Sequence, residues 1–312
     1  MTNQPFLQEV ENDSGLNNLK STQDWLKENK IFIELKLEEH GAIIFKDLPV
    51  KTAEDFDQFV STFNYDTFTY EESLSNAVRI NKTDKVFTAN EAPREVEIFL
   101  HHEMAQTPTY PKNIFFFCKS ASETGGETPL CRSDQLYEAL LKADKALVES
   151  FEKFGVIYNS IMSSGDELIS GQGRSWQKTL GVSSKNDAEE KLSKLGYSWN
   201  WIEDDNLSVT TKTLQATKEL GNGQKSFFNQ VIAASLGWKK NSENQIAPVR
   251  FGNGEEIKES YIELISELAQ SLTLLRSWQD HDILLIDNYR VMHGRKPFAG
   301  YKNREVLVSL TN

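Results

Sequence analysis

The stretch Ile114-Phe115-Phe116-Phe117-Cys118 is one of the longest apolar runs of the chain, and it predicts a strand over residues 113–119. Its three phenylalanines are expected in the hydrophobic core. The run Ile283-Leu284-Leu285-Ile286 predicts a second strand, over residues 283–287. Neither run approaches the roughly 20 apolar residues that a helix needs to span a bilayer, so neither indicates a membrane protein.

Shorter strands and several helices are predicted around these two runs. The further strands are expected over residues 41–45, 98–104, 128–131 and 305–310. Helices are expected after Thr52, where Asp55 completes a capping box, after Ser133, and from Ile257 to Leu275, where apolar residues recur every 3.6 positions. Strands dominate both ends of the chain and helices lie between them. This order favours a mixed α+β fold with a β-sandwich or jelly-roll core and flanking helices.

The domain organisation follows from changes in composition along the 312 residues, a length that fits one large domain or two smaller ones. Residues 1–30 are polar and acidic, and we expect a loose N-terminal arm with a short helix around Trp25. Residues 31–312 are expected to form a single domain. Within it, residues 160–220 are polar and weakly periodic, which predicts an insertion with one helix over residues 187–195 and mobile connections.

The overall charge narrows the choice of partners. The chain has 34 basic and 46 acidic side chains, a formal net charge of −12. Such a protein does not attract nucleic acid or an anionic membrane surface, so neither is an expected partner. Cys118 and Cys131 are too few for a disulfide framework and are expected to be reduced and buried. Together with the absence of a signal-like start, this predicts a cytoplasmic location.

The segment Leu100-His101-His102-Glu103-Met104 contains two of the five histidines next to a carboxylate. In a regular strand, His101 and Glu103 point to one face and His102 points to the other. With His293 as a third ligand, they match the two-histidine, one-carboxylate set of non-haem Fe(II) oxygenases, which leaves one face of the metal open. The pattern His-x-Glu is common, however. These three residues alone are equally compatible with a packed histidine and a surface glutamate.

Two further residues are notable for their spacing in the sequence from these candidate ligands. Thr128 lies 27 positions after His101, and Arg304 lies 11 positions after His293. An oxygenase that uses 2-oxoglutarate needs a cation for the distal carboxylate, and the planar guanidinium of arginine matches a carboxylate. A hydroxyl group beside it would complete the pocket.

With these residues, the chain resembles the taurine dioxygenase (TauD/TfdA) and clavaminate synthase-like group of Fe(II)/2-oxoglutarate oxygenases. Within that group it is most similar to the syringomycin-type hydroxylase branch. The resemblance runs from about residue 38 to the C-terminus, with the motifs in the order of the family. The matching segments are His101-His102-Glu103-Met104-Ala105-Gln106-Thr107-Pro108, Phe115-Phe116-Phe117-Cys118, Gly125-Gly126-Glu127-Thr128-Pro129, Asp287-Asn288, Val291-Met292-His293-Gly294-Arg295 and Arg304.

This resemblance implies a double-stranded β-helix core and a role for each matching residue. It implies that His101, Glu103 and His293 bind Fe(II), and that Arg304 and Thr128 hold the distal carboxylate of 2-oxoglutarate. It further implies that O2 is used to convert 2-oxoglutarate to succinate and CO2 while an unactivated C–H bond is hydroxylated. Halogenating relatives lack the carboxylate ligand, so its presence favours hydroxylation, with desaturation or ring closure as variants. The long interval between Glu103 and His293 makes residues 160–220 an expected lid.

Four residues are weaker candidates for substrate contacts. Asn90 and Glu91 precede the predicted metal strand, Arg174 stands beside Trp176, and Asn229 follows Phe228. Asn90 and Glu91 are equally compatible with a loop of polar residues, Arg174 with a surface stacking pair, and an asparagine such as Asn229 more often has a structural role. For three other residues, the expectation is that His102 packs or forms hydrogen bonds, His281 lies in an exposed turn, and Arg295 either faces the cofactor pocket or forms an exposed salt bridge.

The branch points to a small polar substrate, an amino acid or an amino-acid derivative, either free or attached to a carrier protein. Carrier proteins are usually acidic, and a net charge of −12 gives no general attraction to them. Two alternatives stay open: a Zn(II) hydrolase or isomerase with the same His/Glu/His site, and a non-catalytic binding member of the fold. The former leaves Arg304 and Thr128 unexplained. The long apolar helix is compatible with an oligomer.

Overall fold

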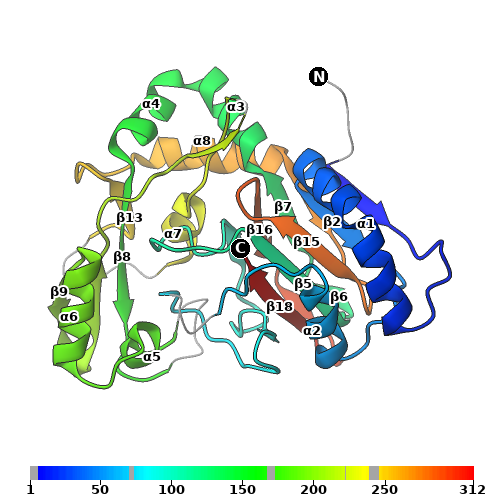
Figure 1. Ribbon diagram of the computed structural model, residues 1–312. Coiled ribbons are helices and arrows are strands. Elements are labelled where there is room, and N and C mark those ends of the chain that lie inside the picture. Colours follow the sequence, from blue (N-terminus) through cyan, green and yellow to red (C-terminus); the bar gives the residue numbers. More distant parts are fainter. Residues whose placement is uncertain (1–5, 70–73, 167–172, 222, 239–245) are drawn as a thin grey trace.

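The computed structural model describes residues 6–69, 74–166, 173–221, 223–238 and 246–312. Figure 1 shows two lobes: a larger one built around two β-sheets, and a smaller one that carries its own sheet and two short helices. The larger lobe is a double-stranded β-helix, or jelly roll, as the motifs predicted. Helices lie outside it and between the lobes.

The jelly roll consists of a six-stranded and a four-stranded sheet. The strands of the first, in spatial order, are β1 (Leu7–Val10), β2 (Ala42–Phe45), β15 (Ile283–Asp287), β5 (Asn113–Ser120), β18 (Glu305–Thr311) and β3 (Phe87–Thr88). The strands of the second are β14 (Thr273–Arg276), β7 (Thr128–Arg132), β16 (Val291–Arg295) and β4 (Ile98–His101). All pairings are antiparallel except that of β1 with β2.

Strand β5 shows why the central strands are apolar without interruption. Phe115 and Phe117 belong to a buried cluster with side chains of the two N-terminal helices. Ile114 and Phe116 belong to another cluster, which lies between the two sheets. Because both faces of the strand are covered, its sequence shows no alternation of apolar and polar residues.

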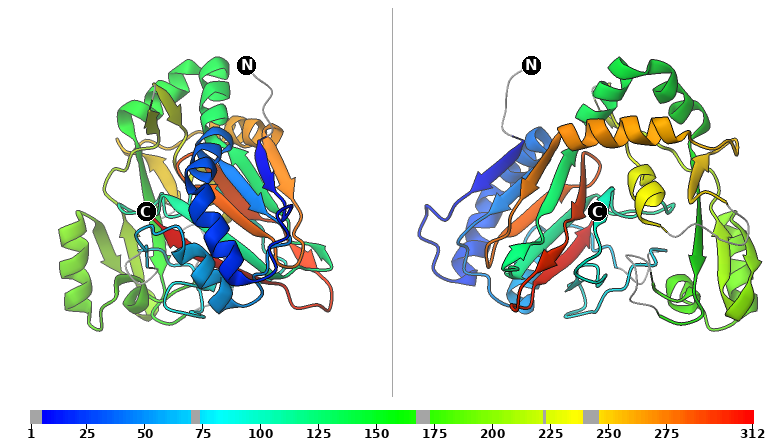
Figure 2. Two further views of the ribbon diagram at one scale, coloured as in Figure 1. Left: turned by 45° about the vertical axis from the view of Figure 1, so that its right-hand side comes forward. Right: turned by 180° about the vertical axis from the view of Figure 1, so that it is seen from behind.

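Helices cover the outside of the jelly roll and connect it to the smaller lobe (Figures 1 and 2). Helices α1 (Leu19–His40) and α2 (Ala53–Ser61) pack on the six-stranded sheet. Thr52 and Asp55 form the predicted capping box at the start of α2. Helix α8 (Glu259–Ser271) extends from the jelly roll toward the smaller lobe, where α3 (Ser133–Ala143), α4 (Lys145–Phe154) and α7 (Val231–Gly237) pack around it.

The smaller lobe contains much of the region predicted as an insertion. Its sheet has the order β13 (Val249–Phe251), β8 (Val156–Met162), β10 (Leu207–Thr210) and β9 (Ser198–Trp201). Helices α5 (Trp176–Leu180) and α6 (Lys185–Leu195) pack on it through a buried cluster of their own. The prediction of a helix over 187–195 is confirmed. Where connections without regular structure were expected, the described residues also form α5, β9 and β10, and residues 167–172 lie outside the described part.

Three short pieces complete the described structure. Strands β11 (Lys218–Gly221) and β12 (Gln224–Ser226) form a hairpin, β6 (Thr124–Gly125) pairs with β17 (Phe298–Ala299), and a 3-10 turn covers Glu203–Asp205.

The N-terminal region differs from the loose arm that its composition predicted. Residues Leu7–Val10 form β1 at the edge of the six-stranded sheet, and α1 runs for 22 residues. The boundary expected at residue 30 therefore falls inside a continuous helix. Leu26 and Ile33 of α1 are buried against the sheet. This burial stabilises a helix whose sequence is otherwise polar.

Three other boundaries also differ from the predictions. The apolar period from Ile257 to Leu275 covers two elements, because α8 ends at Ser271 and Leu275 lies in β14. Ser133 does not cap α3; its hydroxyl donates to the carbonyl of Arg290. The strand expected over 98–104 ends at His101, and β16, which carries His293, was not predicted as a strand.

Cys118 and Cys131 are free and buried, as expected. Among the described residues, none of the helices combines the length and the apolar character that crossing a membrane requires.

Gly294 permits the close approach of β16 to β4. A Cβ atom at this position would lie 2.4 Å from the carbonyl oxygen of Ile98. We expect Gly294→Ala to lower the free energy of unfolding by about 1–3 kcal/mol, because the added methyl group forces the strands apart. Chemical denaturation measures this. The control is Gly165→Ala, whose Cβ meets nothing within 4 Å. Equal stability of the two variants would show that β4 can move away from the added methyl group without an energetic cost.

Candidate metal centre

Two histidines face each other across neighbouring strands. His101 is the last residue of β4, and His293 is the central residue of β16. The two residues are direct partners in the antiparallel pairing of these strands. Their rings lie with centroids 4.5 Å apart. The register of the sheet therefore brings together two side chains that are far apart in the sequence.

Glu103 reaches the same point by a turn and not by strand alternation. It lies two residues beyond the end of β4, and the next residue, Met104, has a φ of 59°. The buried Asn288 amide holds this turn: it accepts from the Glu103 N–H at 2.8 Å and donates to the Glu103 carbonyl at 3.1 Å. The prediction that His101 and Glu103 point to the same face of one strand is therefore wrong, because Glu103 lies beyond the end of the strand. The prediction that the two side chains lie close together is confirmed.

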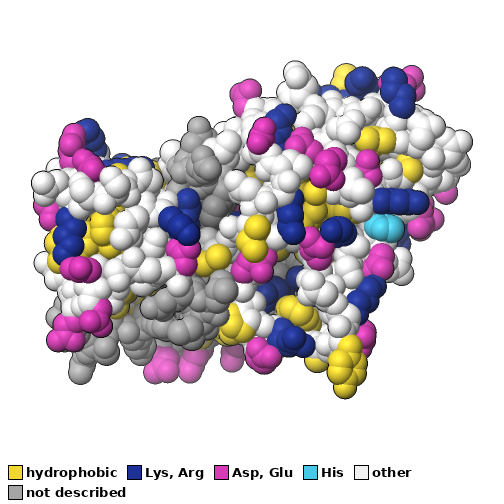
Figure 3. Space-filling model, turned by 90° about the horizontal axis from the view of Figure 1, so that it is seen from below, with side chains coloured by type: hydrophobic (Ala, Val, Ile, Leu, Met, Phe, Trp, Pro, Cys, Tyr) yellow, Lys and Arg dark blue, Asp and Glu magenta, His cyan; other side chains and the backbone are white. Residues whose placement is uncertain are grey.

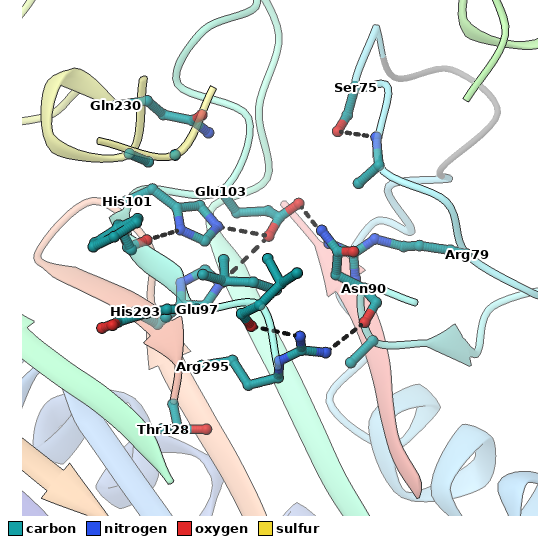
Figure 4. Close-up of a pocket in the computed structure, with 18 of the residues that line it drawn as sticks. Ser75, Arg79, Asn90, Glu97, His101, Glu103, Thr128, Gln230, His293 and Arg295 are labelled. Carbon is teal, nitrogen blue, oxygen red and sulfur yellow. Dashed lines mark hydrogen bonds and ion pairs between the residues drawn. The ribbon is translucent and has the colours of Figure 1, made fainter. Parts of the chain in front are cut away.

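The three ligand atoms lie within 4.8 Å of one another. Glu103 Oε2 is 3.4 Å from His293 Nε2 and 3.9 Å from His101 Nε2 (Figure 4). His101 donates through Nδ1 to the carbonyl of Phe99 at 2.8 Å, so its Nε2 presents a lone pair to the cluster. Burial lowers the pKa of His101 to about 4, which keeps the ring neutral.

Glu103 Oε2 is buried, and no described residue gives it a hydrogen bond. Buried polar atoms without partners are rare in native proteins. A cation between Glu103 Oε2 and the two Nε2 atoms would satisfy all three, and two histidines with one carboxylate suit a divalent transition metal. The residues present therefore fit a metal site.

Arg79 forms a hydrogen bond with the other carboxylate oxygen of Glu103, Oε1. This residue was not predicted from the sequence. Its Nη2 donates to Glu103 Oε1 at 2.9 Å, and both side chains are buried (Figure 4). Burial alone would raise the pKa of Glu103, but the charge of Arg79 and the neighbouring histidines outweigh burial and lower the pKa. Arg79 stands in Ala77-Val78-Arg79-Ile80, where no local pattern distinguishes it from a surface residue.

Thr128 and Arg304 line the cavity that opens above the cluster. Together with the open solvent at its mouth, the cavity encloses about 990 Å³ of space not filled by protein atoms. Arg304 donates to the carbonyl of Gly126 at 3.1 Å, and its Nε is buried without a partner among the described residues. Thr128 Oγ1 accepts from Trp278 Nε1 at 2.9 Å. The arrangement leaves an arginine and a hydroxyl group on one wall of the metal cavity.

Arg295 is buried in the same wall and forms no exposed salt bridge. Its guanidinium donates to the carbonyls of Asn90, Ala92, Pro93 and Val96, at distances between 2.7 and 3.3 Å. It thereby ties the loop before β4 to the strand that carries His293. Burial lowers the pKa of Arg295 to about 10, which still leaves it charged at neutral pH.

The four weaker candidates fall in different places. Asn90 lines the metal cavity, whereas Glu91 is not among its lining residues. Arg174 also lies outside that lining and donates to the carbonyl of Ser75 at 3.4 Å. Asn229 is buried and structural: its amide donates to the carbonyl of Ala216 and accepts from the N–H of Val231.

His102 and His281 lie outside the cluster. His102 is buried, forms a hydrogen bond with the carbonyl of Asn288 and packs on Phe228, as predicted. His281 lies in a turn with a φ of 76°, but it is half-buried and not exposed.

Several residues that line the cavity were not predicted. They have polar or aromatic side chains and come from loops, from the ends of a helix and, for one residue, from β4: Ser75, Asn76, Glu97, Phe99, Gln106, Gln230 and Trp238. Only Gln106 belongs to a motif, since it lies three residues after Glu103. The others carry no local signal, because the tertiary fold alone brings their segments to the cavity.

The comparisons with known proteins agree with this geometry. The family model "Taurine catabolism dioxygenase TauD, TfdA family" matches residues 7–310. A clavaminate synthase-like protein of Arabidopsis thaliana is 33% identical over 286 residues, which cover 91% of this chain and 86% of the relative. The dapdiamide synthesis protein DdaC of Enterobacter agglomerans is 27% identical over 289 residues, covering 88% of this chain and 83% of the relative.

Two solved structures share the fold. A taurine dioxygenase from Burkholderia xenovorans superposes with a TM-score of 0.52 at 12% identity, over 90% of this chain and 79% of that one. AAD-2, crystallised with Mn(II) and N-oxalylglycine, has a TM-score of 0.50 at 14% identity, over 90% of this chain and 86% of that one. The match of the family model over nearly the whole chain, with the His/Glu/His cluster, leads to one conclusion. The chain belongs to the taurine catabolism dioxygenase TauD/TfdA family and is an Fe(II)- and 2-oxoglutarate-dependent oxygenase.

Proposed function

We propose that His101, Glu103 and His293 hold Fe(II), and that Arg304 and Thr128 hold the distal carboxylate of 2-oxoglutarate. The observation that supports this most is the meeting of three ligand atoms within 4.8 Å at a cavity that Arg304 and Thr128 also line. The alternative of a zinc hydrolase does not explain why Arg304 and Thr128 line the same cavity. An arginine in the wall of this cavity would suit the distal carboxylate of a dicarboxylic acid.

The residues around the ligands prepare the site before any substrate binds. Arg79 occupies Glu103 Oε1, which leaves Oε2 as the one carboxylate atom directed at the histidines. The hydrogen bond from His101 Nδ1 to Phe99 fixes the tautomer whose Nε2 can bind a metal. Bound Fe(II) with 2-oxoglutarate and O2 supplies the oxidation, which forms succinate and CO2 and hydroxylates a substrate C–H bond.

For the substrate we propose a small polar molecule, an amino acid or a derivative, free or attached to a carrier protein. The name of the relative DdaC, a dapdiamide synthesis protein, supports a derivative of this kind. Amide side chains of Asn76, Asn90, Gln106 and Gln230 line the cavity and suit polar groups. Figure 3 shows acidic and basic side chains interspersed over the described part of one face, so that part offers no continuous basic patch to an acidic carrier. This favours a free substrate.

Loss of the carboxylate ligand is expected to abolish both metal binding and turnover. Under anaerobic conditions the protein with Fe(II) and 2-oxoglutarate should develop a faint lilac absorption band, and in air it should slowly release succinate. Glu103→Ala should show neither, because only the two histidines of the candidate ligand set remain. Glu149→Ala, at an exposed ion pair of α4, is the control and should match the wild type. A lilac band in Glu103→Ala would remove Glu103 from the ligand set.

Replacement of Arg304 is expected to weaken cosubstrate binding and leave metal binding intact. For Arg304→Met we expect a Kd for N-oxalylglycine at least about 30-fold higher than in the wild type, because a buried carboxylate loses its charged partner. Calorimetric titration of the Mn(II)-loaded protein measures it. Lys302→Met, a neighbouring exposed cation paired with Asp280, serves as the control. Unchanged affinity in Arg304→Met would place the distal carboxylate elsewhere.

Arg79 is expected to act as a positioning residue for Glu103. Without its guanidinium, the carboxylate is free to turn or to bind the metal through both oxygens. For Arg79→Met we expect the affinity for Co(II) to fall about 10–100-fold, the range seen when partners of metal ligands are removed. The Co(II) absorption spectrum should also change, while Arg79→Lys should restore part of the affinity. An unaltered spectrum and affinity in Arg79→Met would argue for a purely structural ion pair.

A further inference from the structure

A second cavity adjoins the metal cavity and lies between the two lobes. Together with the open solvent at its mouth, it encloses about 430 Å³ of space not filled by protein atoms. Residues of the smaller lobe line one side, and residues from the jelly-roll side line the other. The lobe contributes Tyr158, Ser160, Met162, Leu180, Tyr197, Val209 and Thr211, and the opposite side contributes Leu74, Asn76, Gln106, Thr107 and Trp238. We call this space the inner cavity.

The inner cavity adjoins the metal cavity. Asn76, Gln106 and Trp238 line both cavities. Gln106 lies in the turn that begins at Glu103, three residues further along the chain. A ligand group in the inner cavity would therefore lie beside the metal cavity, with these three side chains at the boundary.

Two buried polar atoms at this place lack partners. The hydroxyl of Tyr197 and the Oε1 atom of Gln106 form no hydrogen bond with any described residue. Tyr197 is only 8% exposed, and its ring packs in the apolar cluster of the smaller lobe. Native proteins rarely leave such atoms unsatisfied, because each lost hydrogen bond to water is costly. Tyr197 can offer an O–H donor, and Gln106 Oε1 can accept.

The charge of a ligand in the inner cavity is also restricted. Among the described side chains that line it, none is ionised at neutral pH. Burial raises the pKa of Tyr197, which keeps its hydroxyl protonated. A carboxylate or an ammonium group placed here would lose its water without gaining a counter-charge from these described side chains, which is unfavourable. An uncharged group with both a donor and an acceptor fits instead.

We propose that the inner cavity is the distal subsite of the substrate pocket, and that it binds an uncharged carboxamide. Tyr197 donates to the amide carbonyl, and Gln106 Oε1 accepts from the amide N–H. The rest of the substrate then lies in the metal cavity, with a C–H bond toward His101, Glu103 and His293. This proposal rests on the proposed function, and it makes substrates with an amide end preferable to those with a carboxylate end.

Binding of butyramide and of butyrate tests this proposal. The protein is prepared with and without Mn(II) and N-oxalylglycine, and ligand-observed NMR gives the affinities. We expect butyramide to bind at least tenfold more tightly than butyrate. Tyr197→Phe should weaken butyramide binding about threefold to tenfold, the value of one hydrogen bond. Tyr301→Phe, at a fully exposed tyrosine, is the matched control and should bind like the wild type.

Two further measurements separate recognition from structure. Because the Tyr197 hydroxyl forms no hydrogen bond with described residues, the Tm of Tyr197→Phe should not fall. The substrate-independent release of succinate from 2-oxoglutarate by the wild type and by Tyr301→Phe reports on the metal site separately, so a failure of the proposed function is distinguished from a failure of the inner cavity. Equal binding of butyramide and butyrate, unchanged butyramide binding in Tyr197→Phe, or a crystal structure with only water in the inner cavity at saturating butyramide would each overturn the proposal.

Discussion

The direct pairing of His293 on β16 with His101 on β4 is the constraint on which the rest of the site depends. It sets the separation of two imidazole rings by the geometry of a sheet, which is one of the stiffest elements a protein has. Gly294 allows the strands to approach at this point, since any side chain there would meet the Ile98 carbonyl. The turn that carries Glu103 is then locked by Asn288, which stands just before β16. All three candidate ligands are therefore positioned by one pair of strands.

The electrostatics of the site follow from how each buried charge is compensated. Arg79 pairs with Glu103, and Arg295 is surrounded by four backbone carbonyls. Arg304 has one carbonyl partner and a buried Nε without a described partner, and like Arg295 it lies against the ring of Phe298. An uncompensated buried cation is unfavourable. In our proposal, the distal carboxylate of 2-oxoglutarate is the anion that pairs with Arg304.

In our proposal, the jelly roll carries out the chemistry and the smaller lobe helps to recognise the substrate. The jelly roll carries the candidate metal ligands and the candidate cosubstrate residues, whereas the smaller lobe supplies one side of the inner cavity. This division matches a general property of catalytic folds, in which a rigid scaffold holds the reacting groups and inserted segments determine what binds. In our proposal, Gln106 links the two parts, because it follows Glu103 closely and lines both cavities.

The sequence by itself determined the features that depend on local patterns or on short spacings. Apolar runs were sufficient to identify β5 and β15, the capping box identified the start of α2, and the motifs identified His101, Glu103, His293, Thr128 and Arg304 as one set. What the motifs could not show is how Glu103 reaches the histidines, since its turn is held by Asn288, 185 residues away.

Tertiary structure alone decided the remainder. Arg79 meets Glu103 across 24 residues, and neither residue carries a local sign of the other. Helix α1 and the smaller lobe have polar sequences that predicted an arm and loose connections, yet both are ordered by apolar clusters formed with distant segments. The inner cavity likewise exists only where the two lobes meet. The physical reason is the same in each case: burial and pairing depend on which surfaces the folded chain brings together, and local patterns record only the propensity of a segment.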